Sequence, residues 1–113
     1  MDDVARYLHL TREVMPDRAR EPGINWPVSE DHCFQRIVLD HIAGGRWTDH
    51  INRPAYKNLN GAQAARAVRL CEDILAGRED LHALNQQSLS FRRKVGPRAA
   101  KPRPAPKQTS FDL

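Results

Sequence analysis

The stretch from Val95 to Lys107, VGPRAAKPRPAPK, limits what this chain can fold into. Four of its thirteen residues are proline, and four are Lys or Arg. Proline has no backbone N–H to donate, and like charges keep such a segment extended, so neither a helix nor a sheet is expected there. We therefore predict a folded domain over residues 1–94, a disordered basic linker over 95–107 and a separate peptide over 108–113.

Apolar residues in the predicted domain recur every three or four positions, which is the spacing of one helix face. The clearest stripes are CFQRIVLDHI, over 33–42, and AQAARAVRLCEDIL, over 62–75. Strand patterns are nearly missing from the sequence, so we predict an all-α fold, a small bundle of about four helices. The helices are expected over residues 2–15, 30–43, 61–76 and 80–94.

Local signals predict where these helices begin and end. Pro16 is expected to stop the first helix, because proline breaks the hydrogen-bond ladder. Ser29 is a good N-cap for the second helix, and the glycine pair 44–45 suits its left-handed C-terminal cap. Asn60 followed by Gln63 has the spacing of a capping box for the third helix.

The formal net charge of +4 is unevenly placed. Residues 1–94 hold 14 Lys and Arg against 13 Asp and Glu, whereas residues 92–107 hold seven cations and no acid. We expect these cations to contact nucleic-acid phosphate weakly and non-specifically; the alternative is that they only keep the linker soluble and extended. They are Arg92, Arg93, Lys94, Arg98, Lys101, Arg103 and Lys107.

The dipeptide Asp-His occurs three times, at 31–32, 40–41 and 49–50, nine residues apart. A carboxylate beside an imidazole is typical of metal and acid–base sites. Nine residues turn a helix by about 900°, however, so the first two histidines should point to opposite sides. The sequence also contains no G-x-S-x-G nucleophile motif and no glycine-rich phosphate loop. We expect no metal, no cofactor and no enzymatic activity.

The two cysteines, Cys33 and Cys71, lie in apolar helical stretches without C-x-x-C spacing, which favours buried, reduced thiols. No apolar run approaches the roughly 18 residues of a membrane span. The chain opens with acids at Asp2 and Asp3, whereas targeting peptides open with cations. These features predict a cytoplasmic protein of bacterial type that does not enter a membrane.

The helices expected over 61–76 and 80–94 are joined by a short turn, as in a helix–turn–helix. A recognition helix reads bases from its N-terminal turns, and here those turns open with two acids. Asn85, Gln86 and Gln87 are of a type that can read bases. A small DNA-binding regulator therefore stays an alternative.

The peptide QTSFDL, Gln108–Leu113, resembles the short motif by which bacterial polymerases and repair factors dock on the β sliding clamp, the ring that encircles DNA. In that family a glutamine opens a hexapeptide whose fourth and sixth residues are apolar. The resemblance implies that Gln108 binds at the pocket rim. It also implies that Phe111, in place of the usual leucine, and Leu113 fill the apolar cleft. We therefore expect a non-enzymatic accessory protein of DNA replication or repair.

Two other roles for the side chains of Phe111 and Leu113 stay open. They would also suit a fold-back onto the helical bundle, or an unrelated peptide-binding partner.

The domain itself resembles a group of small bacterial proteins that are labelled GCN5-related acetyltransferases. The resemblance lies in DHCFQRIVLDHIAGG, RPAYKNL and LHALNQQSLSFRRK, and it covers most of residues 28–94. The label implies an enzyme that binds acetyl-CoA. That fold needs a central sheet and a Q/R-x-x-G-x-G/A loop for the coenzyme pyrophosphate, and this sequence has neither. An acetyltransferase is the second alternative.

Overall fold

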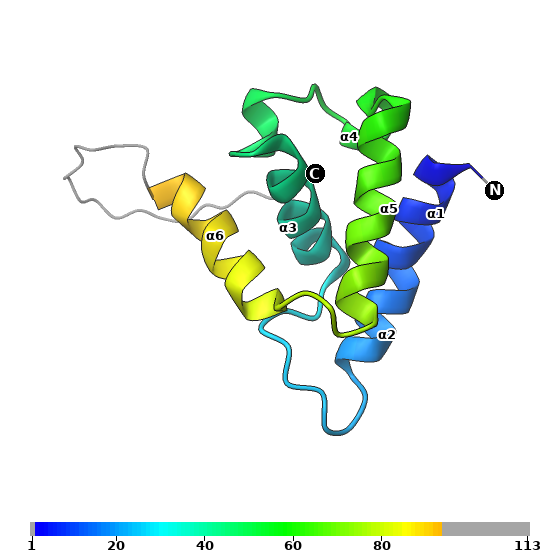
Figure 1. Cartoon of the computed structure of the whole chain (residues 1–113), viewed down its shortest axis with the longest axis vertical. Helices are drawn as coiled ribbons and strands as arrows, with labels where there is room; N and C mark the ends of the chain where they lie inside the picture. Colours follow the sequence, from blue (N-terminus) through cyan, green and yellow to red (C-terminus); the bar gives the residue numbers. More distant parts are fainter. Residues whose placement is uncertain (1, 94–113) are drawn as a thin grey trace.

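The computed structural model describes residues 2–93, and the predicted linker and peptide lie outside this range. The described residues form helices joined by turns and loops, with no strand among them, which confirms the all-α prediction (Figure 1). Within the same range, no helix has both the length and the apolar character needed to cross a membrane. The elements are α1 (Asp3–His9), the π-helix η1 (Leu10–Val14), α2 (Met15–Ala19), α3 (Asp31–Ala43), the 3-10 turn η2 (Trp47–Asp49), α4 (Ala55–Asn58), α5 (Gly61–Leu75) and α6 (Leu81–Arg93).

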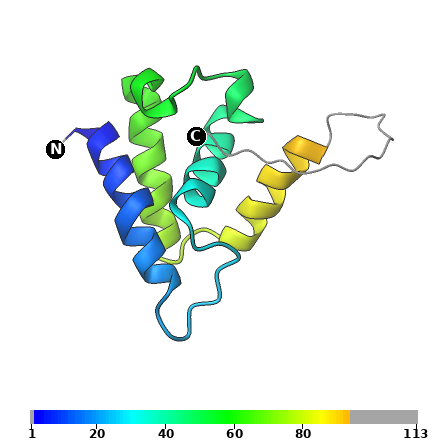
Figure 2. The same ribbon diagram turned by 180° about the vertical axis from the view of Figure 1, so that it is seen from behind.

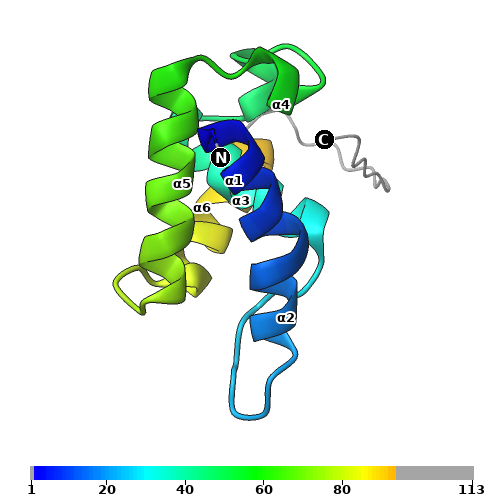
Figure 3. The same ribbon diagram turned by 90° about the vertical axis from the view of Figure 1, so that its right-hand side faces the viewer.

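The prediction that the first helix stops at Pro16 is wrong. The helical path runs from α1 through η1 into α2 and ends only after Ala19 (Figure 3). The π turn η1 shifts the hydrogen-bond register, so Pro16 falls in the first turn of α2, where a backbone N–H is not needed. The Thr11 hydroxyl lies inside this turn and donates to the Tyr7 carbonyl oxygen at 2.9 Å. Tertiary packing therefore stabilises a helical path that continues through Pro16, although proline usually ends a helix.

Helix α3 is the central element of the bundle. Helices α1 and α5 lie side by side, and α3 packs against α5, η1 and α6 (Figures 1 and 2). Neighbours on several sides bury more of α3 than the single apolar stripe predicted, since Gln35, Leu39 and Asp40 are also buried. A helix that is covered nearly all round must satisfy every polar side chain it carries, and this requirement decides the role of Asp40.

Of the three predicted helix caps, two are confirmed and one is wrong. Gly44 ends α3 in the left-handed conformation, with φ at 75°. The Asn60 side chain accepts from the Gln63 backbone at 2.8 Å, and the Gln63 side chain accepts from the Asn60 backbone at 2.9 Å, which completes the capping box of α5. The N-cap of α3 is Glu30, however, one residue beyond Ser29, and it caps without a side-chain hydrogen bond.

The core joins apolar residues from every helix and from the segment between α3 and α5. Trp47 and Ile51, in the chain between α3 and α4 at one end of the bundle, are buried, and Tyr56 is the most exposed large apolar residue of the described range, at 37%. At the other end, Trp26 packs edge-on against Phe34 with ring centroids 5.7 Å apart. The long loop 20–30 therefore closes the core over the start of α3.

Both cysteines are free thiols, but only Cys71 is buried; Cys33 is half-buried, so the prediction of burial is right for one of the two. Burial raises the pKa of the Cys71 thiol from 9.0 to about 12, and the charge of Glu72 adds to the effect. Burial also raises the pKa of the Tyr7 hydroxyl above its usual range. Both groups therefore keep their protons in the folded state at a pH where the unfolded chain loses them.

We expect the protein to lose stability as the pH rises above about 9, because from there the folded state binds more protons than the unfolded state. Each of the two groups contributes a slope of up to about 1.4 kcal/mol per pH unit. Urea unfolding at about pH 7.5 and about pH 10.5 measures this loss. The variant Cys71→Ala should show a smaller difference between the two pH values than the wild type. Equal differences would show that Cys71 does not contribute.

Candidate functional site

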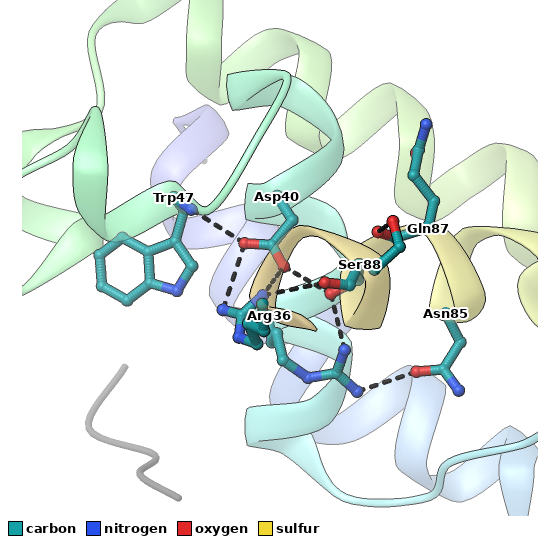
Figure 4. A network of polar contacts seen from close by, with 8 residues as sticks. Arg36, Asp40, Trp47, Asn85, Gln87 and Ser88 are labelled. Atoms are coloured by element: carbon teal, nitrogen blue, oxygen red, sulfur yellow. Dashed lines mark hydrogen bonds and ion pairs between the residues drawn. The ribbon is translucent and has the colours of Figure 1, made fainter. Parts of the chain in front are cut away.

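A buried carboxylate joins the C-terminal half of α6 to α3 and to the chain that follows α3. Asp40 is fully buried, and its carboxylate accepts hydrogen bonds from the Trp47 backbone N–H at 2.9 Å and from the Ser88 hydroxyl at 2.5 Å (Figure 4). The same carboxylate forms an ion pair with the guanidinium group of Arg92. One side chain of α3 therefore contacts both the loop after Gly45 and the last turns of α6.

A second arginine extends this contact one turn earlier along α3. Arg36 donates to the Ser88 hydroxyl oxygen at 2.6 Å and to the Asn85 side-chain oxygen at 2.9 Å. Burial lowers the pKa of Arg36, and the positive charge of Arg92 acts in the same direction, whereas Cys33 and Asp40 oppose them. We call this cluster the α3–α6 clasp. Its members are Arg36, Asp40, Asn85, Ser88 and Arg92.

The clasp fixes the point at which the chain leaves the bundle. Arg92 lies one residue before the end of α6, and Asp40 holds it against α3. Ser88 links the two arginines to the carboxylate, since it accepts from Arg36 and donates to Asp40. The last described turn of α6 is therefore held against α3 by a buried carboxylate.

Sequence reasoning missed the clasp, although two signals for it were present. Asp40 interrupts an apolar run that otherwise reads as core, directly after Leu39. Ser88 follows Leu81 and Leu84 at a heptad-like spacing, which puts it on the same helix face, and both leucines are buried. A buried carboxylate and a buried hydroxyl imply partners, but only the tertiary structure identifies them.

Of the predicted partner-binding and phosphate-contacting residues, the structure describes the side chain of Arg92 alone. That side chain is 30% exposed, and Asp40 engages its guanidinium group. Arg93 closes α6. The others lie outside the described residues: Lys94, Arg98, Lys101, Arg103, Lys107, Gln108, Phe111 and Leu113.

Of the three amide side chains that the sequence suggested for base reading, one is buried and two are exposed. Asn85 is buried and accepts from Arg36, whereas Gln86 and Gln87 are exposed. His82, in the first turn of α6, lies 2.7 Å from the Asn25 carbonyl oxygen through its Nε2. Two of the polar side chains in the first turns of α6 are therefore bound to other residues of the protein, Asn85 in the interior and His82 at the surface.

The three Asp-His pairs do not converge. Asp31 lies 3.6 Å from the ring of His32, Asp40 belongs to the clasp, and Asp49 pairs with Arg46 at 3.3 Å. Over residues 2–93 the structure brings together no group of three or more His, Cys, Asp or Glu side chains that could hold a metal ion.

A second polar feature is an open groove of about 170 Å³ between α3 and α5, which we call the α3–α5 groove. Ile42 and Leu70 are nearly buried and form its apolar base. Arg66 and Arg69 are exposed, and neither has an ion pair or hydrogen bond to another described residue. Its lining consists of His41, Ile42, Arg66, Arg69, Leu70, Asp73 and Glu79.

Comparisons with protein families, with curated proteins and with solved structures found no match to this chain. The functional argument therefore depends on the chain's own residues.

Proposed function

We propose that this chain is a non-enzymatic accessory protein of bacterial DNA replication or repair that docks on the β sliding clamp through QTSFDL. The observation that carries the proposal is the hexapeptide, with Gln108 first, Phe111 fourth and Leu113 sixth. Burying the two apolar side chains in a groove contributes roughly 3–6 kcal/mol before ordering costs. Such an interface gives micromolar binding, which suits a partner that must be released again.

The described domain is compatible with this proposal because residues 2–93 form a core cluster of their own. Among the described residues, the members of this cluster run from Tyr7 to Leu84. The linker 95–107 spans up to about 40 Å at roughly 3.1 Å per residue, enough to seat the domain beside the ring.

The linker cations add a second, weaker contact in this proposal. DNA that passes through the ring would lie close to Arg98, Lys101 and Arg103, and the two contacts together would increase avidity. Contacts to phosphate fall steeply with salt, whereas the apolar contact of the peptide does not. Because Asp40 already engages Arg92, we expect Arg92 to contribute least to DNA binding.

Capture of purified β clamp tests the function directly. The full chain should retain the clamp at micromolar concentration, and a chain that lacks residues 108–113 should not. The matched control carries the same six residues in scrambled order, which keeps composition and charge. Equal retention by all three chains would overturn the proposal. In the described residues, no observation favours the acetyltransferase or the DNA-binding regulator as a second candidate.

A further inference from the structure

The α3–α5 groove lies on a side of α5 that is open to solvent. Helix α1 covers one side of α5 and α3 covers another, while Arg66 and Arg69 are exposed on the remaining side. Asp73 is partly exposed, and Glu79, beyond the end of α5, is exposed. The two arginines come first along the chain and the two acids follow. This surface therefore has a cationic end and an anionic end.

The order of charges on α5 runs against the helix macrodipole. Acids are favoured in the first turn of a helix and cations in the last, because the N-terminal end is partly positive. Helix α5 has no acid in its first turn and no cation in its last, where Glu72 and Asp73 lie instead. Arg6 of α1 offsets the charge of Glu72 at 2.8 Å. The macrodipole therefore does not account for the charges that line the groove.

Intramolecular contacts use only part of these charges. Both nitrogens of Arg78 that bind Asp73 contact its Oδ1 atom, at 2.9 Å, which leaves Oδ2 able to accept a further hydrogen bond. The side chains of Arg66, Arg69 and Glu79 form no hydrogen bond or ion pair with another described residue. Water solvates these groups in the single chain, and they are accessible to a second molecule.

A second copy of the chain has the charges that complement this surface. In a two-fold symmetric contact, a residue that meets another is met by it in return. With two α5 helices antiparallel, Arg69 of each copy faces Asp73 of the other. Arg66 then faces Ala76, three residues before Glu79. Residues 69 and 73 are four apart, so the two Arg69 side chains stay about 6 Å apart along the helix axis.

The shape of this surface allows two helices to approach. Ile42 and Leu70, both nearly buried, form an apolar base beside the point where the helices would cross. Two exposed alanines, Ala62 and Ala76, continue the same helix face at either end. Small side chains at a contact shorten the distance between helix axes. A nucleic acid fits less well, because its phosphates would meet the carboxylates of the anionic end.

We propose that this chain pairs with a second copy of itself across the α3–α5 groove, through antiparallel α5 helices. The contact is weak, because exposed ion pairs contribute little each and the apolar base is small. High salt dissociates the pair, since it screens the charges. The pairing uses only described residues and does not depend on the proposed clamp function.

Reversal of charge in the full chain tests the pairing. The first variant, Arg66→Glu with Arg69→Glu, makes the charged lining wholly acidic, and the second, Asp73→Lys with Glu79→Lys, makes it wholly basic. Sedimentation equilibrium up to about 1 mM chain should show the wild type approaching a dimer. Each variant alone should associate at least tenfold more weakly, because like charges then meet. An equimolar mixture of the two should associate at least as tightly as the wild type.

The matched control is Arg20→Glu with Lys57→Glu, two exposed cations outside the groove with the same change in net charge as the first variant. This control should associate as the wild type does. A wild type that stays monomeric over the whole range would overturn the proposal, and so would a mixture that associates no more tightly than its separate components. Loss of association in the control would also overturn it, since net charge would then be the cause.

Discussion

Replacing Asp40 with alanine is expected to lower the free energy of unfolding by about 3 kcal/mol. Removing one partner of a buried ion pair costs about 3–5 kcal/mol, because the remaining groups stay desolvated without a partner. Here the Trp47 N–H, the Ser88 hydroxyl and Arg92 all lose their shared acceptor. We place the effect at the lower end of that range because Arg92 is 30% exposed and regains contact with water.

The matched control for this prediction is Asp49→Ala. Asp49 pairs with Arg46 at 3.3 Å, and the Asp49 side chain is 56% exposed, so its loss should cost less than about 1 kcal/mol. Urea unfolding followed by circular dichroism compares the two variants. Similar losses for Asp40→Ala and Asp49→Ala would show that the clasp does not hold α6 on α3. The same comparison should show no change in overall helix content for either variant.

Phe111→Ala and Leu113→Ala should each abolish measurable binding to the β clamp. Each change removes buried apolar area worth about 2 kcal/mol or more, a loss of roughly thirtyfold, and a micromolar complex weakened that far escapes routine assays. Gln108→Ala should weaken binding only several-fold, because a rim hydrogen bond of about 1 kcal/mol is partly replaced by water. Titration of fluorescently labelled chains with purified clamp measures all three.

The peptide itself offers a matched control. Thr109→Ala and Ser110→Ala alter spacer positions and should leave the affinity for the clamp nearly unchanged. All variants should keep the helical far-ultraviolet spectrum and one cooperative unfolding transition, since the helices and the core cluster of the described residues lie outside the peptide. A clamp that bound the wild type and the Phe111→Ala, Leu113→Ala double variant equally would rule out the proposed interface.

The location of the clasp gives α6 a role beyond closing the core. Helix α6 packs mainly on α3, and the clasp supplies polar contacts at the half of α6 that is nearest to the linker. Loosening the clasp is therefore expected to weaken the packing of the C-terminal half of α6 on α3.

Features that depend on neighbouring residues were predictable from the sequence. The helical class, the glycine cap at Gly44 and the capping box of Asn60 and Gln63 all arise from contacts within about four residues. The resemblance of the hexapeptide to the clamp-binding motif could be recognised for the same reason, since the motif occupies consecutive positions. Prediction from local contacts fails at Pro16, where packing around η1 maintains the helix through a shift of hydrogen-bond register.

Only the tertiary structure decided which polar groups meet. Asp40 and Arg92 are 52 residues apart, and Arg36 and Ser88 are also 52 apart, so no local pattern pairs them. The α3–α5 groove likewise takes His41 from one helix and Arg66 from another. The amino-acid sequence by itself determined the helical class and the caps at Gly44 and Asn60, because these depend on short-range geometry. The packing of α3 against α5 and α6 determined the clasp and the groove, because buried charges and open clefts exist only where distant faces come together.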